Sequence, residues 1–169
     1  MTTNNEIRIR DATASDRAPI WEIFHTVVAA GDTYVFDPNI PRDEALAYWL
    51  APSHRCYVAE RFETVVGTYI LKANFPALGS HVANAAFMVA PDARGGGIGR
   101  AMGEHALNEA RRLGFRSMQF NLVVSTNAPA VHLWHELGFE VVGTLPGAFR
   151  HRDKGFVDAF VMFRSLAGD

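Results

Sequence analysis

The spacing of hydrophobic residues along the chain predicts a mixture of helices and strands. A first helix is indicated by apolar residues at the interval of one helix face, namely Ile20, Ile23, Phe24, Val27 and Val28. Alternating or uniformly apolar runs predict strands at residues 7–10, 55–61, 64–72, 82–90, 116–124, 139–145 and 155–164. Further helices are predicted at residues 42–50, from about 98 to 113, and at 127–137, with a loop over 33–40.

The order of these elements predicts the fold class. Strands and helices alternate between residues 82 and 145, so we expect an α/β or α+β architecture whose mixed sheet carries helices on both faces. No segment has the composition of a linker, a repeat or a low-complexity tract. A length of 169 residues suits one domain, which is therefore predicted to span residues 1–169.

Composition and charge argue against several classes of function. A formal net charge of −2 provides no overall attraction to nucleic acid or to an anionic membrane, so neither is expected as a partner. Cys56 is the one cysteine, which rules out an intrachain disulfide, and no Cys/His cluster has the spacing of metal ligands. The sequence has no apolar run of the ~20 residues that span a bilayer, nor a signal-peptide pattern, so a cytoplasmic protein is expected.

A glycine-rich segment between a predicted strand and a predicted helix is the strongest candidate for a binding site. It reads Arg94-Gly95-Gly96-Gly97-Ile98-Gly99-Arg100. Glycines allow tight turns and bring N–H groups close to an anion, and the helix N-terminus and two arginines add positive charge. We interpret the segment as a pyrophosphate cradle rather than a flexible turn. Its spacing fits neither an ATP-type P-loop nor a dinucleotide fingerprint.

Two motifs in the sequence resemble signatures of a known family. Arg94-x-x-Gly97-x-Gly99 matches the pattern [QR]-x-x-G-x-[GA], and the segment from Asn127 through Trp134 to Phe139 resembles N-x-x-[AS]-x-x-L-Y-x-x-x-G-F. Both belong to the GCN5-related N-acetyltransferase (GNAT) family, which the chain resembles over roughly residues 6–165. The resemblance implies the GNAT fold, a mostly antiparallel sheet with a splay between two parallel strands, and acetyl-CoA as acetyl donor.

The resemblance also implies roles for individual residues. Backbone groups of Met88 and Val89 would bind the pantetheine arm, and the Val89 N–H would donate to the thioester oxygen. The full set of expected cofactor-binding residues is Met88, Val89, Arg94, Gly95, Gly96, Gly97, Ile98, Gly99, Arg100, Asn127 and Trp134.

Trp134 departs from the family pattern. The family usually has a tyrosine at this position, which acts as general acid for the departing thiolate. An indole N–H donates a hydrogen bond but does not release a proton at neutral pH. Either another group protonates the sulfur or the thiolate leaves unassisted, which a thiol pKa near ~8.5 tolerates.

Three asparagines are candidates for the reaction centre. Asn84 and Asn121 interrupt apolar strands, where a buried amide costs about 1–3 kcal/mol unless it is hydrogen-bonded, and Asn127 follows the second strand. The runs at residues 81–87 and 120–127 also resemble the yeast enzyme that N-acetylates azetidine-2-carboxylate, a proline analogue. By that resemblance Asn84 would bind the substrate carboxylate, and Asn121 and Asn127 would line the reaction centre. The alternative is that these amides satisfy one another or a loop backbone.

Other polar residues are weaker candidates. Asp32 and Tyr34 fall in the loop that covers the acceptor pocket in the family, so they are expected to contact substrate; the alternative is that this segment only ends the preceding helix. His81 at a strand start is either solvent-exposed or a general base. The basic segment 150–154 is either a solvated turn or a contact for the substrate or the cofactor's ribose phosphate.

We therefore predict an N-acetyltransferase that acts on the amine of a small molecule, in particular an amino acid or its analogue, by direct transfer in a ternary complex. The first alternative is an acetyltransferase of the phosphinothricin or methionine sulfoximine type. The second is a non-catalytic acyl-CoA-binding sensor, which the loss of the tyrosine favours. Homodimers are common in the family, and the apolar segment 156–163 offers a surface for one.

Overall fold

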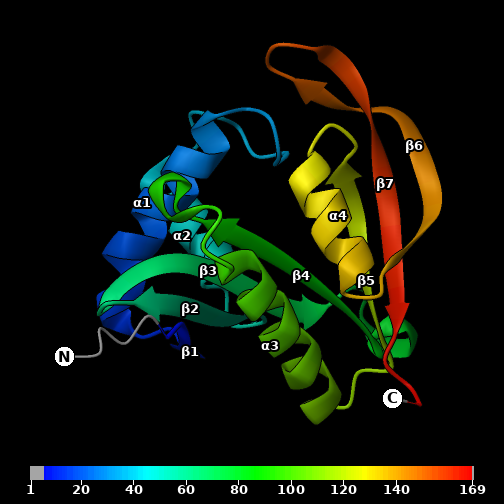
Figure 1. Ribbon diagram of the computed structural model, residues 1–169, viewed down its shortest axis with the longest axis horizontal. Coiled ribbons are helices and arrows are strands. Elements are labelled where there is room, and N and C mark those ends of the chain that lie inside the picture. The colour runs from blue at the N-terminus through cyan, green and yellow to red at the C-terminus, as the bar shows by residue number, and fades with distance from the viewer. Residues whose placement is uncertain (1–5, 169) are drawn as a thin grey trace.

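The computed structural model describes residues 6–168 and contains a seven-stranded sheet in the order β1-β2-β3-β4-β5-β7-β6 (Figure 1). The strands are β1 (Arg8–Asp11), β2 (Arg55–Arg61), β3 (Thr64–Ala73), β4 (Val82–Val89), β5 (Ser117–Val124), β6 (Glu140–His151) and β7 (Gly155–Ser165). The α-helices are α1 (Arg17–Ala29), α2 (Arg42–Trp49), α3 (Ile98–Arg112) and α4 (Ala128–Glu136). Three short 3-10 turns, η1 (Ala14–Asp16), η2 (Ala77–Gly79) and η3 (Pro91–Ala93), complete the order. The expected α/β class with helices on both faces is confirmed.

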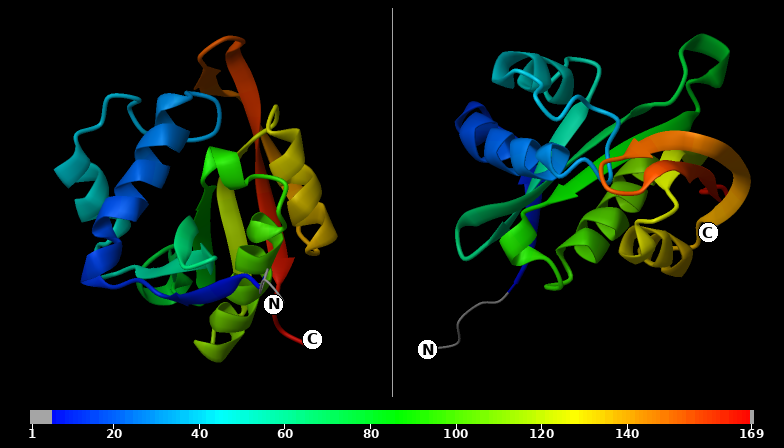
Figure 2. Two further views of the ribbon diagram at one scale, coloured as in Figure 1. Left: turned by 60° about the vertical axis from the view of Figure 1, so that its left-hand side comes forward. Right: turned by 90° about the horizontal axis from the view of Figure 1, so that it is seen from above.

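Each face of the sheet has its own hydrophobic core, because neighbouring residues of a strand point to opposite faces. Helices α1 and α2 cover one face, where Phe24 and Trp49 pack on Val58, Ile70 and Met88. Helices α3 and α4 cover the other face, as Figure 2 shows, with a core that includes Met102, Ala106, Trp134, Tyr69 and Phe120. The sheet therefore lies between two layers of helices and contributes side chains to both cores.

Strands β4 and β5 are parallel and separate soon after they begin (Figure 1). Their register contains only two residue pairs, Val82 with Ser117 and Ala83 with Met118. The pairing of β5 with β7 shifts by one residue between Phe120 and Val123, which marks a β-bulge. Bulges bend the strand that carries them. The bend turns β5 away from β4 and opens a gap between them toward the C-terminal end of β4.

The hairpin of β6 and β7 is longer than predicted. The sequence placed the end of β6 near Leu145, but the strand continues to His151 across an irregularity between Leu145 and Phe149. Gly147 in that irregularity has a φ of 58°, and its N–H donates to Asp158 Oδ1 at 2.9 Å. A break that looks like a strand end in the sequence is thus a bulge that bends the hairpin over the sheet.

The tip of this hairpin contacts the loop after α1, as the left view of Figure 2 shows. The Arg152 N–H donates to the Gly31 carbonyl at 2.9 Å. His151 is buried, whereas Arg150, Arg152, Asp153 and Lys154 are exposed. The interpretation of the basic segment as a solvated turn therefore fits four of its five residues. His151 is the exception, and the backbone of Arg152 connects the turn to the loop after α1.

Several large apolar side chains on β6 and β7 are exposed, including Val142 at 60% and Phe156 at 75%. Phe156 belongs to the segment 156–163 that the sequence offered for a second copy, whereas Val142 lies on β6, the edge strand of the sheet. The homodimer stays a prediction. Among residues 6–168, the helices are too short or too polar to cross a bilayer.

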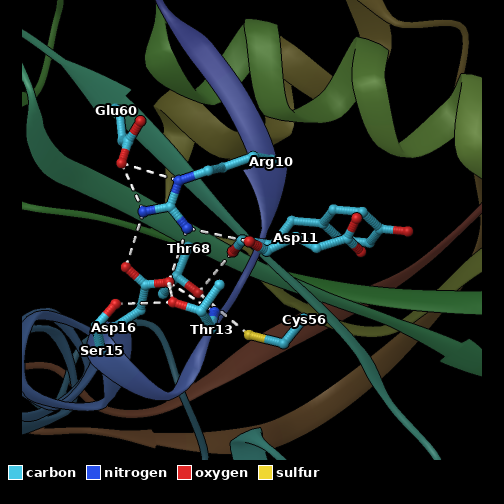
Figure 3. Close-up of polar contacts among 9 residues, drawn as sticks. Arg10, Asp11, Thr13, Ser15, Asp16, Cys56, Glu60 and Thr68 are labelled. Carbon is cyan, nitrogen blue, oxygen red and sulfur yellow. Dashed lines mark hydrogen bonds and ion pairs between the residues drawn. The ribbon is translucent and has the colours of Figure 1, made fainter.

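A partly buried ion pair joins the first strand to the start of α1 (Figure 3). The Arg10 guanidinium donates to both carboxylate oxygens of Asp16, at 2.8 and 2.9 Å, and to Glu60 of β2 at 2.9 Å. Asp16 also accepts the Thr13 N–H at 2.7 Å. Asp16 is 3% exposed, and the Arg10 hydrogen bonds lower its pKa to about 2.

We expect Asp16→Asn to lower the free energy of unfolding by about 1–2 kcal/mol at pH 7, because Arg10 loses its buried partner. An unfolded aspartate titrates near ~3.9, above the folded value, so the unfolded state takes up more protons as the pH falls. The contribution of Asp16 is therefore fully present near pH 6 and is lost as the pH falls toward the folded pKa. Urea unfolding of the unmodified protein and of Asp16→Asn from pH 6 to pH 3 measures whether their free energies of unfolding converge as the pH falls. Asp11→Asn, which alters an exposed carboxylate of the same strand, is the control, and parallel curves for Asp16→Asn would contradict this assignment.

Candidate active site

The main cleft lies where β4 and β5 separate and has a volume of about 760 Å³. Its walls come from the loop between α1 and α2, from β3, β4 and β5, from the start of α4, and from the turn between β6 and β7. The cleft thus reaches from the end of β4, beside the glycine-rich loop, to the hairpin tip.

The open edge of β4 carries backbone groups that no neighbouring strand pairs. The bonds Ala90 N–H to Val66 O and Asn74 N–H to Val82 O, both near 2.9 Å, fix the phase of the β3–β4 ladder. Because successive residues of a strand alternate direction, the even-numbered residues of β4 bond to β3 and the odd-numbered ones face the gap. The Val89 N–H therefore points into the gap, as its expected role requires.

The same alternation along β4 shows that the expected contact between the Met88 backbone and a ligand in the gap is wrong. The backbone groups of Met88 are directed to β3, in register with Thr68, and its side chain is 1% exposed in the core under α1 and α2. The odd-numbered residues Val89, Phe87 and Ala85 direct their backbone groups into the gap instead, and those of Phe87 are bonded to the Tyr34 hydroxyl.

The glycine-rich loop joins β4 to α3 in the expected manner. Gly95 and Gly97 have φ values of 79° and 78°, and a Cβ at either position would meet nothing within 4 Å. Gly97 is the N-cap of α3, whose first N–H groups have no partner within the helix. Exposed backbone, a left-handed turn and a helix N-terminus together make a site for an anion such as a pyrophosphate.

The charges around this loop differ from those expected. Arg94 is exposed and lines the cleft, but Arg100 pairs with Glu136 of α4, and with Glu104 at 3.8 Å. Instead Arg61, at the end of β2, lies against the loop. A Cβ on Gly96 would be 2.4 Å from its Nη1 atom. Arg61 is 35 residues away in the sequence, so no local motif indicates it.

The three asparagines have different environments. Asn84 is half-buried, and its Nδ2 donates to the Gln119 carbonyl at 2.9 Å, which bridges β4 and β5 just where their backbone pairing ends. Asn121 was expected to be buried but is exposed, and its amide pairs with that of Asn74 at 2.7 and 3.1 Å. Asn127 caps α4, its Oδ1 accepting the Ala130 N–H at 3.4 Å. All three line the cleft, and all three have hydrogen-bond partners within the protein.

Trp134 forms part of the cleft wall rather than a polar group within it. It is 8% exposed and packs in an aromatic cluster with Phe87 and Phe120, at centroid distances of 4.9 and 4.7 Å. The environment is that of a core side chain, which agrees with the inference that Trp134 is no proton donor.

Far from the glycine-rich loop, the cleft is lined by a set of charged residues that the sequence did not single out. Lys72 of β3 is the register partner of Asn84, and its Nζ lies 5.6 Å from the Tyr48 ring centroid. No described carboxylate forms an ion pair with Lys72. Lys154 enters from the hairpin tip, and Asp32 is the one carboxylate among the described residues that line the cleft. This end therefore offers two cations and one anion to an acceptor.

Tyr34 makes the most specific contact of the loop between α1 and α2. Its hydroxyl donates to the Phe87 carbonyl and accepts the Phe87 N–H at 3.0 Å. Burial raises the pKa of Tyr34, so the hydroxyl keeps its proton throughout the neutral range.

The remaining titratable candidates lie outside the cleft. His81, His132 and His135 are exposed. Burial raises the pKa of the Cys56 thiol to about 11, which makes it a poor nucleophile. Within residues 6–168 no group of histidine, cysteine and acidic side chains is arranged to hold a metal ion.

Comparisons with known proteins agree with this geometry. The model described as "Acetyltransferase (GNAT) family" matches residues 20–139. N-acetyltransferase aca1 from Schizosaccharomyces pombe is 31% identical over 151 residues, which cover 79% of this chain and 72% of aca1. A GCN5-related N-acetyltransferase structure from Kribbella flavida is 44% identical, with a TM-score of 0.90, and the match covers 94% of this chain and 97% of that one. The structure of yncA from Salmonella typhimurium with its cofactor acetyl-CoA is 26% identical, with a TM-score of 0.85 and coverages of 97% and 96%.

Close packing of α3 on α4 holds Trp134 at the cleft, and Gly103 allows it. A Cβ at Gly103 would lie 2.5 Å from Leu137 Cδ1 and 3.2 Å from Trp134 Cζ3. We expect Gly103→Val to lower the free energy of unfolding by about 2–3 kcal/mol through overpacking, measured by urea denaturation. Gly143→Val is the matched control, because a Cβ there meets nothing within 4 Å. Equal stabilities of the two variants would contradict the packing described.

Proposed function

The chain belongs to the acetyltransferase (GNAT) family, and on that premise we propose that it transfers an acetyl group from acetyl-CoA to the amine of a small amino acid or amino-acid analogue. The observation that carries the proposal is one cleft that extends from Arg94, at the start of the glycine-rich loop, to the neighbouring side chains of Lys72 and Asn84. The closer similarity to acetyltransferases of azetidine-2-carboxylate stays a prediction within this proposal.

The donor end of the cleft fits coenzyme A in its chemistry. The N–H groups from Gly95 to Arg100 would hold the pyrophosphate, with the guanidinium groups of Arg94 and Arg61 beside them. The Val89 backbone would bind the pantetheine arm in the gap between β4 and β5. Acetyl-CoA supplies the activated acetyl thioester.

The acceptor end favours a molecule that carries both an amine and a carboxylate. Lys72 and Asn84 lie side by side on the face of the sheet toward α1 and α2, and together they can bind a carboxylate. Asp32, on the loop across the cleft, attracts an ammonium group. An amino acid presents these two charges within a few ångströms of each other, which suits a small cleft.

The chain contributes to transfer mainly by positioning both molecules. The Val89 N–H donates to the thioester oxygen as negative charge develops there. The deprotonated amine nitrogen bonds to the acetyl carbon, the C–S bond breaks, and the thiol leaves as thiolate. One proton leaves the ammonium group before the attack and a second leaves the nitrogen as the amide forms, and both pass to water or to Asp32. The thiolate later takes up a proton from water, because the indole N–H of Trp134 does not release its proton.

We expect Arg61→Gln to weaken acetyl-CoA binding about fivefold at low ionic strength, because a cation beside the pyrophosphate is lost. The difference from the unmodified protein decreases as salt is added, since this interaction is solvent-accessible. Isothermal titration calorimetry at several salt concentrations measures both effects. Arg55→Gln, at the other end of the same strand, is the control; an unchanged affinity in Arg61→Gln would remove Arg61 from the donor site.

The acceptor assignment is tested by a thiol-release assay with Lys72→Met, which keeps most of the length of the unbranched side chain and removes its charge. With azetidine-2-carboxylate, methionine sulfoximine and phosphinothricin, we expect kcat/KM to fall about 10- to 100-fold, mainly through KM. With an amine that has no anionic group, the same substitution changes kcat/KM little.

The pattern across acceptors decides between the alternatives. Turnover restricted to phosphinothricin and methionine sulfoximine supports an acetyltransferase of the phosphinothricin or methionine sulfoximine type. An equal fall in kcat/KM with amines that carry an anionic group and with amines that lack one would show that Lys72 recognises no carboxylate. Tight acetyl-CoA binding without release of thiol on any amine would favour a sensor.

A further inference from the structure

His151 is the one histidine among the described residues that line the cleft. It ends β6 at the tip of the hairpin and is 8% exposed. Its ring meets that of Phe149 edge-on, at a centroid distance of 6.4 Å. A buried imidazole in a cleft either donates a hydrogen bond or accepts a proton, and its tautomer decides which.

One hydrogen bond determines this tautomer. The Asp153 backbone N–H donates to Nδ1 of His151 at 3.1 Å. A backbone N–H only donates, so Nδ1 must supply the lone pair, and the neutral ring carries its proton on Nε2. Within residues 6–168, this is the one hydrogen bond that the ring makes. The ring therefore has an N–H donor to offer to a ligand, and its lone pair is already in use.

This donor lies beside the loop that carries Asp32. The Arg152 N–H donates to the Gly31 carbonyl at 2.9 Å. His151 and Asp32 are the chain neighbours of these two residues, so the bond holds them at the same end of the cleft. Thr33 also lines the cleft, and its hydroxyl oxygen is buried without a hydrogen-bond partner among the described residues. Buried polar groups are normally hydrogen-bonded, so two such groups on adjoining segments indicate a ligand with polar atoms.

We propose that His151 is a specificity residue for the acceptor, and that its Nε2–H donates to an oxygen of the acceptor's carboxylate. The inference rests on the proposed function, because it takes the acceptor to be an amino acid or its analogue. Lys72 and Asn84 approach the carboxylate from the sheet, whereas His151 approaches it from the hairpin tip. A carboxylate has two oxygens with about four lone-pair sites, so it accepts bonds from both directions. The ring takes no proton from the amine, which leaves Asp32 or water for that role.

The test compares two substitutions that each keep one half of the imidazole. In His151→Asn the side-chain oxygen still accepts the Asp153 N–H, as in an Asx turn, but no group reaches the place of Nε2. In His151→Gln an amide N–H lies near that place. With the anionic acceptor that the unmodified protein acetylates fastest, we expect His151→Asn to raise KM about tenfold with little change in kcat. His151→Gln raises KM less than about threefold, because it restores the donor.

Two further measurements separate this role from a structural one. With an amine that has no anionic group, KM changes little in either variant, and thermal unfolding shows whether the hairpin turn is intact. Long-range proton–nitrogen NMR correlation reports the tautomer of each imidazole without any need for turnover. The chain has seven histidines, and the signals of His151 are identified by their absence in His151→Asn. We expect them to show a proton on Nε2 and none on Nδ1.

The results that contradict the proposal are distinct from one another. A ring protonated on Nδ1 would overturn it, as would equal KM values in His151→Asn and the unmodified protein. A loss of kcat in both variants with every acceptor is the pattern of a general base and would overturn it too. Failure of the unmodified protein to acetylate any amino acid or analogue would refute the proposed function, and the carboxylate contact with it.

Discussion

The separation of β4 from β5 is the constraint on which the candidate site depends. Two residue pairs join these parallel strands, and the β-bulge near Asn121 then bends β5 away. Buried backbone N–H and C=O groups must find partners, so a sheet opened at its centre is stable only if something else supplies them. Asn84 supplies one such bond at the start of the gap, Tyr34 supplies two at Phe87, and the Val89 N–H remains directed into the gap.

The rest of the molecule holds this opening in place and gives its two ends different chemistry. Helix α3 begins at the end of β4 and directs its N-terminus and the glycine-rich loop toward the donor end. The bend at Gly147 carries the β6–β7 hairpin across to Gly31, which brings Lys154 to the acceptor end. In our proposal, this one opening joins a site for the phosphates of the donor to a site for a small charged acceptor.

The sequence indicates the local features of this arrangement well. The limits of β2 and the loop at Gly95 and Gly97 agree with the structure, because strand periodicity and glycine turns are encoded in neighbouring residues. Features that depend on residues far apart in the sequence were missed or misjudged. Arg61 reaches Gly96 from β2, Arg100 turns to Glu136, and the ladder phase directs Met88 away from the gap. Only the packed fold determines these contacts.

Hydrogen–deuterium exchange with and without saturating acetyl-CoA tests the central claim, that the gap between β4 and β5 is where the donor binds. We expect slower exchange in peptides covering Phe87–Val89 and Gly95–Arg100, since a bound ligand protects the N–H groups that face it. Peptides from β1, the edge strand of the sheet, keep their rates. Unchanged exchange along β4 in a protein saturated with acetyl-CoA, or protection confined to another surface, would contradict the account.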